Sequence, residues 1–327
     1  MFILKTYKED LLEKNSLFRE LLEYIDSRRE IIEQRIREEL SEYEEEIKEV
    51  AKYIVHGGKR LRGVLALLMA EALGGSVEKS LNAAIAIEMV HSASLALDDI
   101  IDGDLFRRGK PSSWVKYGIS HTVLVSNFLI PKAQLLIKIY GFEALINVIS
   151  AWLQTTTGEI LDAFGETMPL SSQYEKIIDL KTGSVFKMAT YLGSKSANAD
   201  EEAIKVASEY GRYLGLLYQI VDDLTDVLSG DPKKLESKSI KLYLEWLGAR
   251  DMKNIEEVSE KSSEKIIEYI NLTISKASLL PESRYKKLLI LFPIFVTYAL
   301  LKEIGSLGLN YFYNRLYPKI LPIIQIA

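Results

Sequence analysis

The chain contains no cysteine and only three histidines, His56, His91 and His121, in 327 residues. The absence of cysteine excludes disulfides, thiolate metal sites and a cysteine nucleophile. Three widely separated histidines do not suit a zinc site. The net charge of −5 is opposite to the basic field typical of a nucleic-acid-binding protein. We therefore expect no nucleic-acid partner and no zinc or thiol chemistry.

Long apolar runs are also scarce. The longest, Leu288 to Leu301, is short for a membrane span and is interrupted by Pro293. After Met1 to Leu4 the N-terminus becomes charged within a few residues, unlike a signal peptide. With 48% hydrophobic and 27% charged residues, the composition is that of a soluble globular protein. We expect a cytoplasmic protein without a transmembrane segment.

Helical periodicity dominates the chain, and no stretch shows sustained strand-like alternation. The expected helices are Asp10–Ile25, Ser27–His56, Val64–Leu73, Ser80–Ile101, Ser120–Tyr140, Phe142–Phe164, Tyr174–Leu192, Glu201–Leu228, Met252–Ser278 and Arg284–Ile304. No long linker or low-complexity tract separates them. The sequence predicts one all-α domain over residues 1–327, a large helical bundle.

Two acidic clusters with the pattern D-D-x-x-D each follow an apolar run. They are Asp98, Asp99 and Asp102, and Asp222, Asp223 and Asp226. An i, i+4 pair of acids lies on one helical face, where like charges repel, and the C-terminal end of a helix disfavours negative charge. Folding alone gains nothing from this arrangement, so the clusters indicate cation binding.

Carboxylate oxygens combined with phosphate oxygens suit Mg²⁺, which accepts one or two carboxylates per ion. The six acids could hold a small cluster of Mg²⁺, two to three ions, on a diphosphate. Neutralising the diphosphate in this way would make it a good leaving group.

Basic residues accompany the acids. Gly57 and Gly58 permit a tight turn, after which the cations Lys59, Arg60 and Arg62 project from the start of the next helix. A helix N-terminus with adjacent cations can bind a diphosphate, although the segment could also be an ordinary basic loop.

Other polar residues lie near the acids in sequence. Arg107 and Arg108 could either neutralise the first cluster or grip a phosphate. His91 shares a helical face with Asp98, where it could contact ligand or simply be a core residue. Lys181 and Thr182, then Tyr218 and Gln219, precede the second cluster.

These motifs resemble those of the trans-isoprenyl diphosphate synthases, the polyprenyl synthetase family, of geranylgeranyl or longer-chain type. Gly57-Gly58-Lys59-Arg60-x-Arg62, Asp98-Asp99-x-x-Asp102 with Arg107-Arg108-Gly109, Lys181-Thr182, and Tyr218-Gln219-x-x-Asp222-Asp223-x-x-Asp226 occur in the family's order and spacing. The resemblance implies an all-α bundle around a central cavity, usually homodimeric.

The resemblance further implies Mg²⁺-dependent head-to-tail condensation of isopentenyl diphosphate with an allylic diphosphate. Both acidic clusters, Arg107 and Lys181 would hold the allylic diphosphate. The diphosphate of isopentenyl diphosphate would lie against Lys59, Arg62, His91 and Arg108. Thr182, Tyr218 and Gln219 would lie near the reacting carbons, and the departing diphosphate would act as the base.

The sequence departs from the family pattern at four places. Gly63 replaces a common proline, Leu97 a frequent histidine, and Ser126-Asn127 a common Gly-Asp. The lysine-rich segment after the second cluster is degenerate over residues 230–239, where Lys238 is the best candidate for the missing allylic-diphosphate lysine. Two alternatives stay open: a non-catalytic or regulatory homologue in a heteromeric prenyl synthase, and a class I terpene cyclase.

Product length should depend on the helix preceding Asp98, because the growing tail must run along it. One isoprene unit is about as long as one helical turn, ~5.4 Å. Ala93 and Ser94, one turn back, are small. Val90 and Ile87 lie deeper and form no obvious floor. We therefore expect a trans-polyprenyl product of C20 or longer, unless Ala93 and Ser94 only permit close helix packing.

Overall fold

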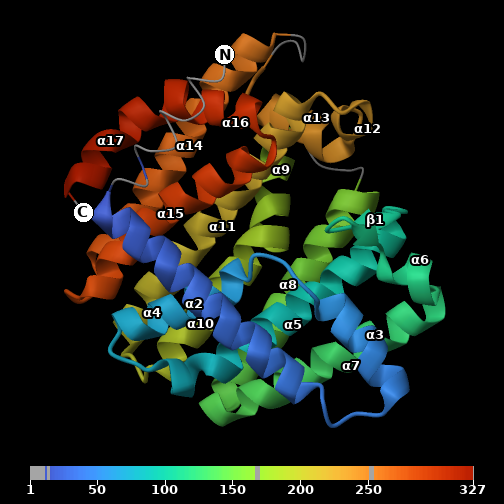
Figure 1. Ribbon diagram of the computed structural model, residues 1–327. Coiled ribbons are helices and arrows are strands. Elements are labelled where there is room, and N and C mark those ends of the chain that lie inside the picture. The colour runs from blue at the N-terminus through green and yellow to red at the C-terminus, as the bar shows by residue number, and fades with distance from the viewer. Residues whose placement is uncertain (1–11, 13–14, 166–169, 250–253, 327) are drawn as a thin grey trace. The chain divides into compact units, whose positions relative to one another are not determined.

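The computed structural model describes residues 12, 15–165, 170–249 and 254–326 and is built almost entirely from helices (Figure 1). The helices of the first half are α2 (Ser16–Glu39), α3 (Glu45–Val55), α4 (Leu61–Ala72), α5 (Val77–Ile101), α6 (Ser113–Tyr117), α7 (Ile119–Ile137), η1 (Lys138–Tyr140) and α8 (Phe142–Phe164). Those of the second half are α9 (Leu170–Ile178), η2 (Asp179–Gly183), α10 (Ser184–Ser196), α11 (Glu201–Ser229), α12 (Pro232–Leu235), α13 (Lys238–Trp246), α14 (Ile255–Ser278), α15 (Arg284–Glu303), α16 (Ser306–Tyr311), η3 (Phe312–Leu316) and α17 (Tyr317–Ile326). The predicted all-α class is confirmed.

Several helix boundaries differ from the prediction. The expected helix Ser27–His56 is wrong, because α2 ends at Glu39 and α3 begins only at Glu45. The expected break at residue 26 does not exist, since α2 is continuous from Ser16. Charged residues run through the whole stretch, so composition gives no sign of the turn at 40–44. The first residues of the expected helices Asp10–Ile25 and Met252–Ser278 lie outside the described part of the chain.

The chain divides into two compact units. Unit 1 comprises Met1–Leu22, Ala151–Lys187 and Lys205–Ala327, and unit 2 comprises Glu23–Ser150 and Met188–Ile204. The single domain over residues 1–327 therefore stays a prediction.

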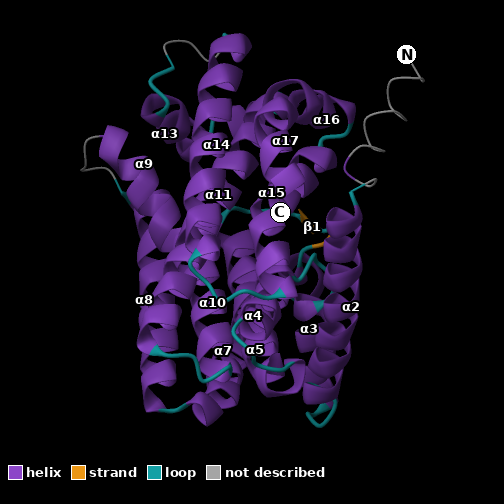
Figure 2. Ribbon diagram, turned by 90° about the vertical axis from the view of Figure 1, so that its left-hand side faces the viewer, coloured by secondary structure: helices purple, strands orange, loops and turns teal. Residues whose placement is uncertain are grey.

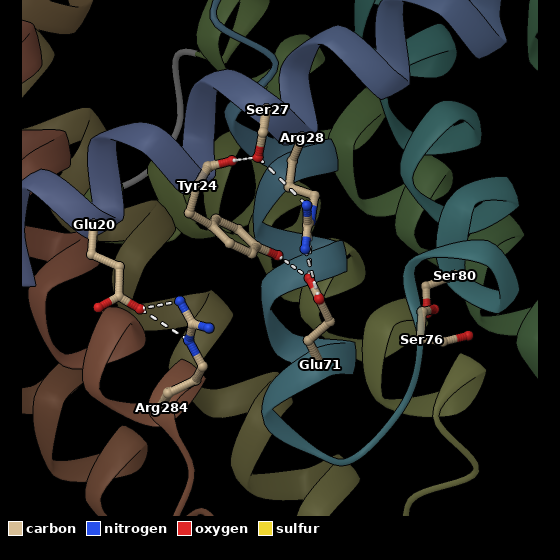
Figure 3. A network of polar contacts seen from close by, with 8 residues as sticks. All are labelled: Glu20, Tyr24, Ser27, Arg28, Glu71, Ser76, Ser80 and Arg284. Atoms are coloured by element: carbon tan, nitrogen blue, oxygen red, sulfur yellow. Dashed lines mark hydrogen bonds and ion pairs between the residues drawn. The ribbon is translucent and has the colours of Figure 1, made fainter.

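In unit 2 the long helices α5 and α7 lie side by side (Figure 1), and α4 packs against α5. Every residue of α4 is buried, including its charged residues Arg62 and Glu71. A charge inside a protein needs a partner. Glu71 finds it on α2, where Arg28 donates from Nε and Nη2 at 3.0 and 2.8 Å and the Tyr24 hydroxyl donates at 2.6 Å (Figure 3). These bonds fasten α4 to α2.

Two strands interrupt the helices of unit 2 (Figure 2, orange). Strands β1 (Phe106–Arg107) and β2 (Lys110–Pro111) pair antiparallel around the two-residue turn Arg108-Gly109. Both turn residues have positive φ, 54° and 73°, as a tight hairpin turn of this length requires. This hairpin has no sign in the sequence periodicity, because two-residue strands are too short to show alternation.

In unit 1 the chain from α9 to α10 is not one regular helix. The predicted helix Tyr174–Leu192 is helical throughout, but Asp179–Gly183 form a π-helical turn between α9 and α10. Such turns are often found at functional sites. Lys181 and Thr182 lie within it.

Two further contacts hold unit 1 together. Helix α13 packs along α9 (Figure 1), and the Arg284 guanidinium of α15 pairs with Glu20 on α2 (Figure 3).

One segment among the described residues, Ile119–Tyr140, is long and apolar enough to cross a membrane by length and composition. A core helix of a soluble protein meets the same two criteria. One face of α7 packs along α5 within unit 2, and 44% of the apolar window is buried.

Candidate functional site

The first acidic cluster closes α5, as the sequence predicted. Asp98 lies in the last turn, and Asp102 is the C-terminal cap and is exposed. Asp99 behaves differently because it is 2% exposed. Its Oδ1 accepts from Nε of Arg107 at 2.7 Å and also from Nη2 of the same guanidinium. Although burial alone would lower the pKa of Arg107, Asp99 raises it, so this arginine stays charged.

The hairpin turn sends its two arginines to different places. Arg107 on β1 reaches back to Asp99, whereas Arg108 donates from Nη1 to the carbonyl oxygens of His56 and Gly57 at 2.7 and 3.0 Å. The guanidinium passes close to Gly58, whose φ of 92° favours glycine. A Cβ there would lie 2.8 Å from Cζ of Arg108. The structure thus brings Arg108 onto the basic loop that the sequence analysis assigned to the same ligand.

Arg60 corrects the prediction that three cations project from this loop. Its φ of 53° turns the side chain inward, and it is 2% exposed. The guanidinium pairs with Glu33 at 2.7 Å and approaches Glu88 at 3.6 Å. Arg60 therefore fixes the loop from inside, which leaves Lys59 and Arg62 as the candidate ligands.

Glu88 gives Gly63 a specific role. The backbone N–H of Gly63 donates to Oε1 of Glu88 at 2.7 Å, and a proline at this position has no N–H to donate. A Cβ at residue 63 would also lie 2.9 Å from Cγ of Glu88. The replacement of proline by glycine is therefore matched to a buried carboxylate on α5.

His91 and Arg62 are in direct contact. Nη1 of Arg62 lies 3.0 Å from Nε2 of His91. Since a guanidinium can only donate, Nε2 accepts and the imidazole is neutral. Burial, followed by the charge of Arg62, lowers the pKa of His91 well below its ordinary value. Their side chains form one hydrogen-bonded unit, as expected for two groups on the same ligand.

A cavity of about 250 Å³ opens in unit 2. It is bounded by α3, the loop at residues 56–58, α5 and the hairpin, and its lining includes Gly58, Asp99, Arg107 and Arg108. Lys110 of β2 also lines it, a cation that the sequence analysis did not single out. The cavity joins the first acidic cluster to the glycine-rich loop.

The four residues expected to govern product length lie on α5. Ala93 is fully buried and Ile87 is 7% exposed, whereas Ser94 and Val90 are half-buried. Ser94 donates its hydroxyl to the carbonyl oxygen of His91 at 2.8 Å. Of the small pair, Ser94 is therefore the more accessible.

In unit 1, Lys181 lies between two acids of α8. Its Nζ is 2.7 Å from Glu159 and 2.9 Å from Asp162. Although burial alone would lower the pKa of Lys181, Asp162 and then Glu159 raise it. Helix α8 can approach this closely because Gly158 has no Cβ, which would lie 2.8 Å from the backbone nitrogen of Lys181.

Thr182 and Gln219 are joined to the second cluster by hydrogen bonds. The Thr182 hydroxyl donates to Oε1 of Gln219 at 2.8 Å, and Nε2 of Gln219 donates to Oδ1 of Asp223 at 3.1 Å. Asp223 is 3% exposed, and its Oδ2 accepts from the Tyr174 hydroxyl at 2.5 Å. Burial, with Asp222 adding to it, raises the pKa of Asp223 to about 7.

The two lysines of the degenerate segment have different partners. Nζ of Lys238 donates to the carbonyl oxygens of Leu161, Asp162 and Gly165 at 2.9, 3.0 and 2.5 Å. An ammonium group has three donors, so this set occupies all of them. Lys234 on α12 instead pairs with Asp226. A cation does accompany the second cluster, and in this structure it is Lys234.

The donor set fits Mg²⁺. Among the described residues, no three His, Cys, Asp or Glu side chains converge on one point as a metal cage. Mg²⁺ usually takes one or two carboxylates and completes its shell with water and substrate phosphates. Asp98 and Asp102, four residues apart on α5, supply carboxylates of that kind.

Several residues that help to form these sites are not among the predicted site residues, including Glu88, Glu159 and Tyr174. Glu159 could have been found, since Glu159 and Asp162 recur at i, i+3 on a helix whose end is polar. Tyr174 and Glu88 could not, because each stands in an ordinary helical pattern.

Comparison with known proteins agrees with this arrangement. The polyprenyl synthetase family model matches residues 44–240. The hexaprenyl pyrophosphate synthase of Saccharolobus solfataricus is 35% identical over 259 residues, which are 78% of this chain and 87% of that protein. The geranylfarnesyl diphosphate synthase of Methanosarcina mazei is 36% identical over 238 residues, 71% of this chain and 77% of that protein.

A solved structure is also similar. The geranylgeranyl pyrophosphate synthetase of the archaeon Geoglobus acetivorans superposes with a TM-score of 0.76 at 28% identity, covering 84% of this chain and 99% of that one. The chain belongs to the polyprenyl synthetase family. It is a prenyltransferase, and the family resemblance drawn from the motifs is confirmed.

The different partners of Lys234 and Lys238 predict different losses. Lys238→Met should destabilise the fold by about 1–3 kcal/mol, because the last carbonyls of α8 lose a charged donor. Lys234→Met should leave stability almost unchanged, since an exposed ion pair contributes little. It should instead lower the rate of prenyl transfer by removing the cation beside Asp226. Thermal unfolding and initial rates of both variants test this, and the opposite pattern would return the ligand role to Lys238.

Proposed function

We propose that this chain condenses isopentenyl diphosphate head to tail with an allylic diphosphate, giving a trans-polyprenyl diphosphate of C20 or longer. The carrying observation is the linked set of Asp99, Arg107, Arg108 and the glycine-rich loop in unit 2. The hydrogen-bonded pair of Arg62 and His91 lies beside it on α4 and α5. Such a set of fixed cations beside acids is suited to binding diphosphate with a metal.

The two diphosphates are held by different residues. The allylic diphosphate is held by both acidic clusters and two cations: Asp98, Asp99 and Asp102, Asp222, Asp223 and Asp226, Arg107 and Lys181. Isopentenyl diphosphate is held by Lys59, Arg62, His91 and Arg108. The neutral state of His91 supports this assignment, because a neutral imidazole can donate from one ring nitrogen while Nε2 accepts from Arg62. Lys234, which pairs with Asp226, completes the allylic side, since the three donors of Lys238 are taken by carbonyl oxygens of residues 161–165.

Mg²⁺, two to three ions bound through both acidic clusters, would supply charge neutralisation of the departing diphosphate. Lys181 contributes positive charge to the departing diphosphate. A bound diphosphate would replace Glu159 and Asp162 of α8 as the partners of Lys181. Arg107 stays charged through Asp99, so it adds a fixed cation.

The reaction then follows from the substrates. The allylic C–O bond breaks, its electron pair leaves with diphosphate, and an allylic cation remains. The double bond of isopentenyl diphosphate attacks that cation and forms the new C–C bond. A proton lost from the adjacent carbon goes to the diphosphate, and a new double bond closes. Thr182, Tyr218 and Gln219 lie near the reacting carbons and orient them, with the Thr182–Gln219 bond fixing both side chains.

The whole of residues 1–327 acts as one cytoplasmic domain, and the active form is a homodimer. An apolar row supports the dimer. The row consists of five residues that are between 36% and 77% exposed: Leu135 of α7, Ile139 of η1, and Phe142, Ile146 and Ile149 of α8. On α8 the spacing of four and three residues puts them on one face. A second copy of the chain would cover this row.

The assay that tests the function uses purified protein, Mg²⁺, labelled isopentenyl diphosphate and allylic primers of increasing length. We expect incorporation that requires Mg²⁺. Asp98→Ala should lower turnover by several orders of magnitude, because metal-assisted charge stabilisation typically supplies several kcal/mol. Absence of incorporation with every primer would contradict the proposal, and an unchanged rate in Asp98→Ala would remove the first cluster from the mechanism.

Product length is tested at Ser94. Ser94→Phe should shorten the product by one or more isoprene units, because an aromatic ring one turn from Asp98 blocks the path of the tail along α5. Chromatography of the dephosphorylated products measures this. Ala93→Val is a control for packing, since Ala93 is fully buried and its enlargement should lower stability first. A wild-type product of C15, or an unshortened product from Ser94→Phe, would be inconsistent with this assignment.

The dimer is tested by charge in the apolar row. The double variant Phe142→Asp, Ile146→Asp should convert a dimer into a monomer, because two carboxylates would be buried without partners. Light scattering after size exclusion measures the mass. Leu279→Asp is the matched control, since Leu279 on the end of α14 is 67% exposed but lies outside the row. A monomeric wild type, or a dimeric double variant, would disprove the assignment of this face.

A further inference from the structure

The hydroxyl of Tyr174 lies inside unit 1 and meets a carboxylate there. Tyr174 on α9 is 1% exposed, and its Oη donates to Oδ2 of Asp223 at 2.5 Å. A hydrogen bond to a charged or partly charged acceptor at this distance is among the stronger ones. Asp223, itself buried, belongs to the second acidic cluster. A residue of α9 therefore determines where one of the cluster's three acids points.

The other oxygen of Asp223 is also engaged. Oδ1 accepts from Nε2 of Gln219 at 3.1 Å and lies 3.5 Å from the Ser239 hydroxyl at the start of α13. Gln219 and Asp223 are four residues apart and share one face of α11. Asp222 and Asp226, also four apart, share the neighbouring face, and both are half-buried. The cluster thus divides into an inward acid and an outward pair.

The inward acid sets the direction of the Gln219 amide. A carboxylate oxygen can only accept from Gln219, so the NH₂ group faces Asp223 and the carbonyl oxygen faces away. That carbonyl oxygen accepts from the Thr182 hydroxyl at 2.8 Å. Tyr174, Asp223, Gln219 and Thr182 form one directed chain of hydrogen bonds, which ends in the π-helical turn that carries Lys181.

The ring of Tyr174 is held by aromatic neighbours on α13. Its centroid lies 5.4 Å from that of Tyr243 and 5.0 Å from that of Trp246. Tyr243 is also fully buried, but its hydroxyl is 2.6 Å from Ser262 on α14 and not at the acidic cluster. The cluster of rings therefore contains two buried tyrosines whose hydroxyls have different partners.

We propose that Tyr174 is a positioning residue for prenyl transfer. Its hydroxyl holds Asp223 inward, so that Asp223 orients Gln219 and Thr182 and leaves Asp222 and Asp226 as the metal-facing pair of the second cluster. This inference rests on the proposed function for its catalytic consequence. It also gives Asp223 a role different from that of a direct Mg²⁺ ligand.

The test is Tyr174→Phe, which removes the hydroxyl and keeps the ring between Tyr243 and Trp246. Outer-shell residues around a metal site typically contribute ten- to hundredfold to metal affinity or activity. We expect the half-saturating Mg²⁺ concentration to rise about tenfold and turnover to fall at least as much. The KM for isopentenyl diphosphate should not change, since its proposed ligands all belong to unit 2.

Tyr243→Phe is the matched control. It removes a buried hydroxyl from the same ring cluster, at a distance from Asp223, and should keep the wild-type Mg²⁺ dependence even if its melting temperature falls. Thermal unfolding of both variants separates a loss of fold from a loss of positioning. Equal Mg²⁺ curves for Tyr174→Phe and wild type, or the same shift in both variants, would overturn the proposal.

A second measurement separates this proposal from the proposed function. Calorimetric binding of inorganic pyrophosphate in the presence of Mg²⁺ requires no condensation. If the wild type binds pyrophosphate but incorporates no isopentenyl diphosphate, the proposed function fails while Tyr174 can still be tested. Weaker Mg²⁺-dependent binding in Tyr174→Phe alone then supports the positioning role. A wild type that binds no pyrophosphate with Mg²⁺ refutes both.

Discussion

Two consecutive residues of a helix point about 100° apart, so two consecutive acids face different surroundings. Both acidic clusters obey this constraint. Asp98 and Asp222 are half-buried, whereas Asp99 and Asp223 are 2% and 3% exposed. A buried carboxylate must receive hydrogen bonds or a counter-charge. The remainder of each site is organised around the group that meets this need.

The two inward acids are satisfied in chemically different ways. Asp99 receives a guanidinium from the hairpin, so the first cluster is tied to a fixed positive charge. Asp223 receives neutral donors, from Tyr174 and Gln219. Burial without a cation is the reason that the pKa of Asp223 rises to about 7. The inward acid of the first cluster therefore pairs with a cation, whereas in the second cluster the cation, Lys234, pairs with the outward acid Asp226.

The sequence predicted the parts of this protein that depend on spacing. The acids at i and i+4, the glycine-rich turn and the length of α5 and α11 follow from local periodicity and turn chemistry. It could not predict the direction in which Arg60 turns, because that depends on a φ of 53° and on the partners Glu33 and Glu88. Nor could it separate Lys234 from Lys238, since both follow the cluster and only the end of α8 distinguishes them. Tertiary partners, not local pattern, decided each of these.

The hydrogen bond between Gly63 and Glu88 affects how the N-terminus of α4 can bind an anion. The first four N–H groups of a helix, counted from the N-cap, have no partner within it and can bind an anion. In α4 the fourth of them, at Gly63, already binds Glu88, a carboxylate from this chain. The positive end of α4 is thus partly neutralised before any ligand arrives. In the proposed binding of diphosphate at the basic motif, positive charge would therefore come mainly from the side chains of Lys59, Arg62 and Arg108. Arg60, buried against Glu33 and Glu88, holds in place the loop that carries Lys59.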